Sequence, residues 1–200
     1  MIDDCVDISS LGSYAFWYGQ IAERSGGGGR AGARGGAVMS EDGALLIHRF
    51  RVPMGDTDAA QIIYFGAPMR WAERLFTDWL ATIGMPTSEV LRAGFGLPAV
   101  HAELSYRRPL RLDERVRGEL RLHRRSARSI TWRCEFFSDD DDDDDDDGGG
   151  VAVEVLITQV YARIDPAGPV TVPLPGQLLA HLPADLPAPP TDAKTTKEPR

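Results

Sequence analysis

The stretch from residue 67 to 83 constrains the fold most, because its apolar side chains fall on one face of a helix. Pro68 suits the first turn of such a helix, while Gly84 and Pro86 indicate its end. So broad an aromatic face needs a large apolar surface to cover it, most simply a β-sheet. The residues of this face recur at intervals of three and four positions; they are Ala72, Leu75, Phe76, Trp79, Leu80 and Ile83.

Five stretches of alternating or β-branched apolar residues predict strands. One precedes the helix, at 44–52, and four follow it, at 97–107, 115–124, 128–137 and 151–163. Because short links join the four later strands, we expect neighbours in sequence to pair as an antiparallel meander. This order of elements predicts an α+β fold, with one long helix wrapped by a curved antiparallel sheet of about five strands.

The segments around the predicted domain, 44–164, differ from it in composition. Residues 1–43 hold a glycine-rich run and are expected to be disordered or a misassigned extension, or else a docking segment on a tether. The loop 138–150 carries nine consecutive aspartates, which predict a solvated, flexible loop; a cation-binding or partner-repelling role is the alternative. Residues 165–200 are predicted to be a proline-rich tail with a short helix at 173–182.

Charge and cysteine content argue against several classes of protein. The net charge of −8 comes from the aspartate run, so the rest of the chain is close to neutral and nucleic acid is not an expected partner. Cys5 and Cys134 form no CxxC pair, and neither a metal site nor a cofactor is expected. No apolar run reaches the roughly 18 residues of a membrane span. We therefore expect no membrane partner and a cytoplasmic protein.

Two aspartates, Asp56 and Asp58, lie just ahead of the predicted helix. A carboxylate can act as a general base or as a nucleophile. The backbone N–H groups at the start of the helix, around Phe65 and Gly66, are expected to be unpaired and could stabilise an oxyanion. Together these features suit attack on an activated acyl group. The alternative is that both aspartates only build an Asx-type turn.

The order of these residues resembles hotdog-fold thioesterases of the 4-hydroxybenzoyl-CoA thioesterase type. The resemblance covers approximately residues 44–164 and implies a hotdog fold that hydrolyses an acyl-CoA or acyl carrier protein thioester. It also implies a homodimer or homotetramer with the active site between subunits. The matching motifs are Asp56-Thr57-Asp58, Ile62-Ile63-Tyr64-Phe65, Arg70-Trp71, Glu73, Leu104-Ser105-Tyr106 and Arg128-Ser129.

The resemblance also implies a role for individual residues. Asp58 matches the catalytic aspartate, acting as nucleophile or general base. The backbone amide of Phe65, with that of Gly66 beside it, matches the oxyanion site. The residues expected to contact the acyl group or the CoA phosphates are Gln61, Tyr64, Glu73, Arg125, Arg128 and Ser129.

This chain departs from the family's pattern at the candidate site. Ala59 stands where a proline is usual, and Gln61 where a glycine is usual. Gln61 places a side chain where the acyl group or water is expected, so the acyl group is not predicted. Two other functions remain: a non-catalytic module that binds acyl thioesters, and, less favoured, a hydratase or dehydratase. The histidine that such dehydratases carry at the helix start is missing here.

Overall fold

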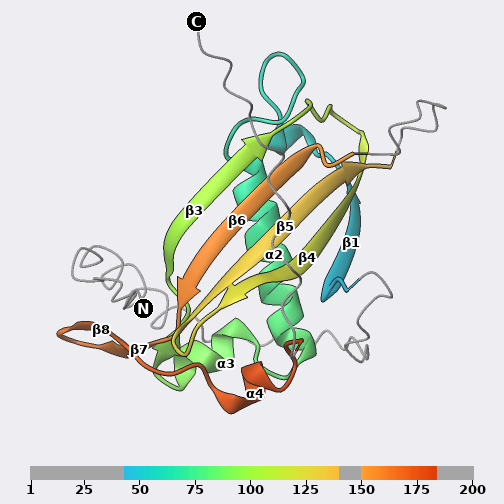
Figure 1. Ribbon diagram of the computed structural model, residues 1–200. Coiled ribbons are helices and arrows are strands. Elements are labelled where there is room, and N and C mark those ends of the chain that lie inside the picture. Colours follow the sequence, from blue (N-terminus) through green and yellow to red (C-terminus); the bar gives the residue numbers. More distant parts are fainter. Residues whose placement is uncertain (1–42, 140–149, 184–200) are drawn as a thin grey trace, which may run out of the picture.

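The computed structural model describes residues 43–139 and 150–183, which form an α+β structure (Figure 1). The expectations for residues 1–42, 140–149 and 184–200 lie outside these ranges. A helix, α2 (Ala67–Thr82), lies across one face of an antiparallel sheet of five strands. The strands are β1 (Leu46–Arg51), β3 (Ala99–Tyr106), β4 (Arg115–Arg125), β5 (Ser129–Ser138) and β6 (Val153–Val160). The predicted α+β class with a five-stranded sheet is confirmed.

The order of the sheet, β1-β4-β5-β6-β3, corrects the expected meander. The meander holds for β4, β5 and β6, but β3 pairs with β6 at the far edge and not with β4. The reason lies in the link between β3 and β4, which bonds to the chain that follows β1. Ile63 N donates to Leu110 O at 3.0 Å, and Asp113 N donates to Val52 O at 3.0 Å. The chain therefore enters β4 beside β1.

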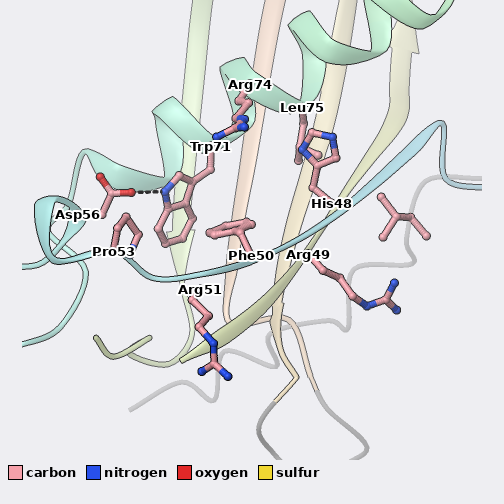
Figure 2. Close-up of a pocket in the computed structure, with 10 residues that line it drawn as sticks. His48, Arg49, Phe50, Arg51, Pro53, Asp56, Trp71, Arg74 and Leu75 are labelled. Carbon is pink, nitrogen blue, oxygen red and sulfur yellow. Dashed lines mark hydrogen bonds between the residues drawn. The ribbon is translucent and has the colours of Figure 1, made fainter. Parts of the chain in front are cut away.

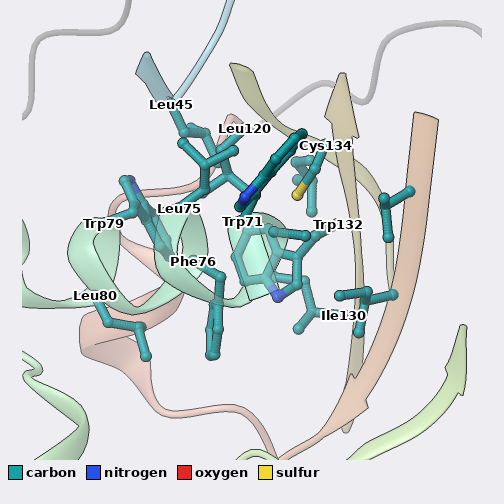
Figure 3. Packing of buried hydrophobic residues seen from close by; sticks show 14 of the residues in the cluster. Leu45, Trp71, Leu75, Phe76, Trp79, Leu80, Leu120, Ile130, Trp132 and Cys134 are labelled. Atoms are coloured by element: carbon teal, nitrogen blue, oxygen red, sulfur yellow. The ribbon is translucent and has the colours of Figure 1, made fainter. Parts of the chain in front are cut away.

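The core lies between α2 and the sheet (Figure 3). Trp79 packs edge-on against Trp132 with ring centroids 5.1 Å apart, and Trp71 packs in the same way on Phe136 at 5.4 Å. Gly118 of β4 leaves room for both partners, because a Cβ atom there would lie 2.9 Å from Phe136 Cε1 of β5 and 3.4 Å from Leu75 Cδ1 of α2. Truncating one of these buried aromatic side chains to alanine would cost about 3–5 kcal/mol. The buried residues of α2 are Ala67, Pro68, Trp71, Ala72, Leu75, Phe76, Trp79 and Leu80.

The C-terminal end of α2 is capped by a segment from much later in the chain. Gly84 adopts φ +75°, the left-handed conformation typical of the residue after a helix. Gln177, in the short helix α4 (Gly176–Leu179), donates from its side-chain amide to the carbonyl oxygens of Ile83 and Gly84 at 3.0 and 3.2 Å. Leu178 is fully buried and anchors α4 in the core. The carbonyl groups of the two residues that follow α2 thus obtain partners from α4.

The single strand expected at 151–163 is divided into two. β6 ends at Val160, and β7 (Ala162–Asp165) joins a second sheet with β2 (Phe95–Gly96) and β8 (Gly168–Thr171). Four consecutive buried residues, Gln159 to Ala162, break the alternation of a strand with one covered face. Tyr161 at the break stacks on Phe95 with ring centroids 5.2 Å apart. The small helix α3 (Thr87–Arg92), also not expected from the sequence, leads into this second sheet.

The outer face of the five-stranded sheet is covered by ion pairs. Glu119 is only 3% exposed and lies between Arg117 and Arg121, which both bind its carboxylate. Arg133 Nε lies 3.6 Å from Glu154 Oε2 on the neighbouring strand. Charged side chains therefore cover much of this face, and the Arg117 guanidinium also covers Phe137, with its Cζ atom 4.2 Å from the ring centroid. In the described ranges, no helix is long and apolar enough to cross a membrane.

Candidate active site

The candidate site is built on a tight loop between β1 and α2. After the 3-10 turn η2 (Met54–Asp56), Thr57 and Ile63 form an antiparallel bridge. At its tip, Asp58 N donates to Ile62 O at 2.9 Å, and Gln61 N donates to Asp58 O at 3.0 Å. Gln61 adopts φ +62°, a left-handed conformation that glycine adopts without steric cost. This explains why glycine is usual at this position in the family that the sequence resembles. The loop thus holds Asp58 at an exposed turn.

The two aspartates of the loop have different surroundings. Asp56 Oδ2 accepts a hydrogen bond from Trp71 Nε1 at 2.6 Å, and Asp56 Oδ1 accepts one from Arg70. This pairing raises the pKa of Arg70. The side chain of Asp56 is 14% exposed. Asp56 therefore binds the loop to α2, and both of its oxygens are engaged.

Asp58, in contrast, keeps one carboxylate oxygen without a partner among the described residues. Its Oδ1 accepts a hydrogen bond from Ala60 N at 2.8 Å, which completes an Asx-type turn. Its side chain is exposed. Of the two aspartates, Asp58 is the one that can still reach a substrate or a water molecule.

Two backbone amides at the start of α2 are unpaired. In the described part of the chain, the N–H groups of Phe65 and Gly66 donate to no acceptor. Their neighbours are fixed, since Tyr64 N donates to Asp56 O at 3.0 Å and Ala67 N donates to Tyr64 O at 2.9 Å. The Tyr106 hydroxyl donates to Phe65 O, and burial raises the pKa of Tyr106. These contacts hold the two N–H groups in place for an external acceptor.

Tyr64 covers Gly66 directly. A Cβ atom at position 66 would lie 2.7 Å from Tyr64 Cε2, so only glycine leaves room for the ring. The Arg70 guanidinium lies 4.8 Å from the centroid of this ring and donates to its hydroxyl. The requirement for glycine here is steric, since the backbone of Gly66 has an ordinary φ of −93°. Tyr64 is thereby held beside the two unpaired amides.

A mostly apolar pocket of about 220 Å³ lies between α2 and strands β5 and β6. Glu73 contributes to its lining and is exposed to solvent. The two buried polar side chains deep in its wall are satisfied: Trp132 Nε1 donates to Gln159 Oε1 at 2.7 Å, and Gln159 Nε2 donates to Leu97 O at 2.9 Å. The wall is therefore fixed in shape, and it offers an acyl group apolar contacts.

The basic residues expected at the CoA phosphates lie at the other end of the sheet. Arg125 and Arg128 flank the β4–β5 turn, in which the hydroxyl groups of Ser126 and Ser129 are 2.7 Å apart. Ile62 in the Asp58 loop bridges to the residues just before β4, and β4 then runs for 11 residues, or about 35 Å, to this turn (Figure 1). One copy of the chain does not bring the arginines and Asp58 together.

Sequence reasoning missed a second, more polar groove of about 410 Å³ between β1 and α2 (Figure 2). It contains Asp56 and Trp71 of the loop contact, together with His48 and Arg74. Partial burial lowers the pKa of His48, and the nearby carboxylate of Asp78 opposes this effect. The sequence of β1 contains a signal for this groove. Its charged or polar residues, His48, Arg49 and Arg51, do not follow the strict alternation of a strand that covers a core with one face. No cluster of metal-ligating side chains occurs in the ranges described.

The chain belongs to the thioesterase-like superfamily, whose family model matches residues 52–182. Within it, a 1,4-dihydroxy-2-naphthoyl-CoA hydrolase of Prochlorococcus marinus (strain MIT 9303) is 28% identical over 106 residues, which cover 49% of this chain and 70% of that relative. The resemblance to the 4-hydroxybenzoyl-CoA thioesterase type is therefore confirmed. The class of enzyme expected from the sequence, an acyl-CoA thioesterase, is also the class to which such relatives belong.

Solved structures share the fold. A 4-hydroxybenzoyl-CoA thioesterase in complex with 4-hydroxybenzoyl-CoA aligns with a TM-score of 0.61 at 17% identity, covering 69% of this chain and 98% of that one. A 1,4-dihydroxy-2-naphthoyl-CoA thioesterase from Synechocystis aligns with a TM-score of 0.59 at 19% identity, covering 68% and 93%. The hotdog fold expected from the sequence is thus the fold of these proteins.

Proposed function

We propose that this protein hydrolyses an acyl-CoA thioester to a free carboxylic acid and a thiol, with Asp58 as its catalytic carboxylate. One observation carries the proposal: Asp58 keeps a free carboxylate oxygen just ahead of a helix that begins with two unpaired amides. Membership of the thioesterase-like superfamily and the CoA-thioester hydrolases among its relatives support the same reaction.

The chemistry requires an attacking oxygen and a site for the developing negative charge. Asp58 attacks the thioester carbonyl itself, or removes a proton from the water that does so. The N–H groups of Phe65 and Gly66 stabilise the oxyanion as the tetrahedral intermediate forms. The C–S bond then breaks, and the thiolate leaves and takes up a proton. When Asp58 itself is the nucleophile, the acyl group stays on its carboxylate as an anhydride, which a water molecule hydrolyses to release the acid and restore Asp58. An acyl carrier protein would present the same thioester and is the alternative carrier.

The pocket between α2 and the sheet is the proposed acyl site. At about 220 Å³ it is smaller than the roughly 300–1,000 Å³ of sites for drug-sized ligands, which favours a compact acyl group such as an aryl group over a long chain. Glu73 lies at this pocket, while Tyr64 and Gln61 lie toward the loop. The aromatic acyl groups in the names of relatives agree with this size.

A homodimer would complete the site. β3 is an edge strand with mostly exposed residues, and such edges invite pairing with a second chain. Antiparallel pairing of two β3 strands about a two-fold axis reverses the partner end for end. The partner's β4–β5 turn, with its arginines, would then lie at the end of the sheet that carries Asp58. This arrangement places phosphate-binding residues within reach of the thioester, and residues 44–164 would form the catalytic domain of each copy.

Replacing Asp58 tests the reaction. We expect full-length protein to release thiol from at least one member of a panel of aryl and aliphatic acyl-CoA esters. Asp58→Asn should lower kcat/KM by about 10²-fold or more, the scale for losing a catalytic acid/base group. Asp78→Asn, the same change at an exposed carboxylate of α2, is the matched control and should retain activity. Equal activity in Asp58→Asn would refute the site, and no thiol release from any ester would favour a binding module.

A proline in β3 tests the dimer. Arg107 N donates to Ala152 O, so the alternation of an antiparallel ladder turns the N–H of Ala102 toward the free edge. Ala102→Pro should therefore leave the pairing with β6 intact while it blocks pairing with a second copy. We expect light scattering to show a dimer or tetramer for the unmodified protein and a folded, inactive monomer for the variant. A fully active monomer would contradict the shared site.

A further inference from the structure

The groove between β1 and α2 opens onto the free edge of a strand. Its lining includes five consecutive residues of β1, from Ile47 to Arg51. Successive side chains of a strand point to opposite faces, so a groove lined by all of them must lie along the strand's edge. Figure 2 shows the opposite wall, which Trp71 and Arg74 of α2 provide.

The backbone along this edge is available for pairing. Val52 N donates to Glu114 O at 3.0 Å, which shows that every second residue of β1, counted back from Val52, bonds to β4. By the alternation of an antiparallel ladder, the N–H and C=O groups of Ile47, Arg49 and Arg51 point to the other side. No strand pairs with that side in the described part of the chain. An extended peptide could therefore add to the sheet here.

The groove combines positive charge with an aromatic floor. Phe50 and Trp71 meet edge to face with ring centroids 5.0 Å apart. Arg49 Nε is paired with Asp139 at 3.3 Å, and its side chain is 68% exposed. Such exposed pairs are worth about 1 kcal/mol or less and exchange readily for another carboxylate. The acidic residue in the lining is Asp56, whose oxygens are already bound by Arg70 and Trp71.

We propose that residues 3–23 of this chain occupy the groove, with backbone pairing along β1 and an aromatic side chain on Phe50 and Trp71. This segment, DDCVDISSLGSYAFWYGQIAE, has four acidic residues, no basic residue and the consecutive aromatics Phe16, Trp17 and Tyr18. Its charge is opposite to that of the groove. Its aromatic side chains can pack on the aromatic floor of the groove. A nucleotide phosphate or a purely acidic peptide would pair with the arginines but would leave this floor without an aromatic contact.

The tether has the right length. Residues 24–43 connect the segment to the start of β1 and are rich in glycine. A glycine-rich chain of 20 residues has a typical end-to-end distance of roughly 25 Å, while the six residues of β1 extend over about 20 Å. Every point of the groove is thus within reach. Tethering also gives an effective concentration in the millimolar range, so contacts that are weak between separate molecules suffice.

The two cysteines allow a direct test on the full-length protein. Cys5 lies in the proposed segment, whereas Cys134 is buried in the core, and burial raises the pKa of its thiol to about 12. A photoactivatable maleimide such as benzophenone maleimide will therefore label Cys5. After irradiation, we expect mass spectrometry to find most adducts in residues 44–56 and 70–79 of the same chain. Adducts mainly at β3 or at the β4–β5 turn would overturn the proposal.

Isotopic mixing excludes exchange between copies. When ¹⁵N-labelled and unlabelled chains are mixed, refolded together and cross-linked, we expect adducts to join segments of one chain, with a yield independent of protein concentration. Adducts that join labelled to unlabelled chains and increase with concentration would show that a second copy supplies the occupant. That result would overturn the proposal.

Charge reversal tests the complementarity. The double variant Arg49→Glu/Arg51→Glu should lower the yield of groove adducts by about 5-fold, the scale for losing exposed ion pairs and gaining repulsion. The matched control, Arg92→Glu/Arg163→Glu, changes two exposed arginines outside the groove and should keep the yield of the unmodified protein. Circular dichroism checks that both variants are folded. Equal yields in the two variants would overturn the proposal.

Discussion

Replacing Gln61 with glycine should stabilise the protein. Gln61 holds φ +62°, and an L-residue with a side chain pays roughly 1–2 kcal/mol for this left-handed conformation. Its side chain is exposed and forms no hydrogen bond within the described residues, so glycine loses no contact there. Glycine adds about 0.4–1 kcal/mol of unfolded-state entropy, which opposes folding. The expected net gain is about 0.5–1 kcal/mol, or about 1–4 °C in Tm.

Urea and thermal unfolding at one protein concentration measure this gain. Asp113→Gly is a positive control, because Asp113 is also exposed and holds φ +65°. Ala60→Gly in the same loop is the matched negative control, since Ala60 has no positive φ and the change should cost about 0.5–1 kcal/mol. If Gln61→Gly left the urea midpoint unchanged or lowered it, the side chain would be making a stabilising contact, and the strain argument would be refuted.

Two further changes probe the loop. Gly66→Ala places a methyl group 2.7 Å from the ring of Tyr64, so the ring should move and kcat/KM for thiol release should fall by about tenfold or more. The control is Gly55→Ala, where nothing lies within 4 Å, and it should behave like the unmodified protein. Equal kcat/KM values for the Gly66→Ala and Gly55→Ala variants would count against this role of Tyr64. Asp56→Ala removes two charge-assisted hydrogen bonds and should lower the free energy of unfolding by about 1.5–3 kcal/mol in urea titrations, whereas an unchanged midpoint would mean that the loop is held by other contacts.

The helix and most strands were predictable because their signals are local. The spacing of Leu75, Phe76 and Trp79 defines one helical face without reference to any other part of the chain. Strand order was not predictable in this way. The pairing of β3 with β6 depends on where residues 110–113 bond, and those bonds join segments about fifty residues apart. Alternation along a strand contains no information about its neighbour.

The site was predictable as a set of residues and not as an arrangement. The sequence distinguishes Asp58 from Asp56 only through the family's pattern, whereas the structure gives a physical difference: Trp71 and Arg70 bind one carboxylate and leave the other exposed. The distance of Arg125 from the loop follows from the direction of β4. No local pattern could have indicated it, because it depends on the path of the chain after β3.

The contact between Gln177 and the end of α2 has a consequence for the order of folding. Its two residues are 94 positions apart, and the first strand pairs with a strand about seventy residues later. Such non-local contacts slow folding, because long loops must close before they contribute stability. During synthesis α2 emerges well before β5, β6 and α4, so its row of tryptophan, phenylalanine and leucine side chains stays uncovered until the ribosome has released most of the domain. Aggregation of the nascent chain is therefore most favoured in that interval, and chaperones that bind apolar helices would act there.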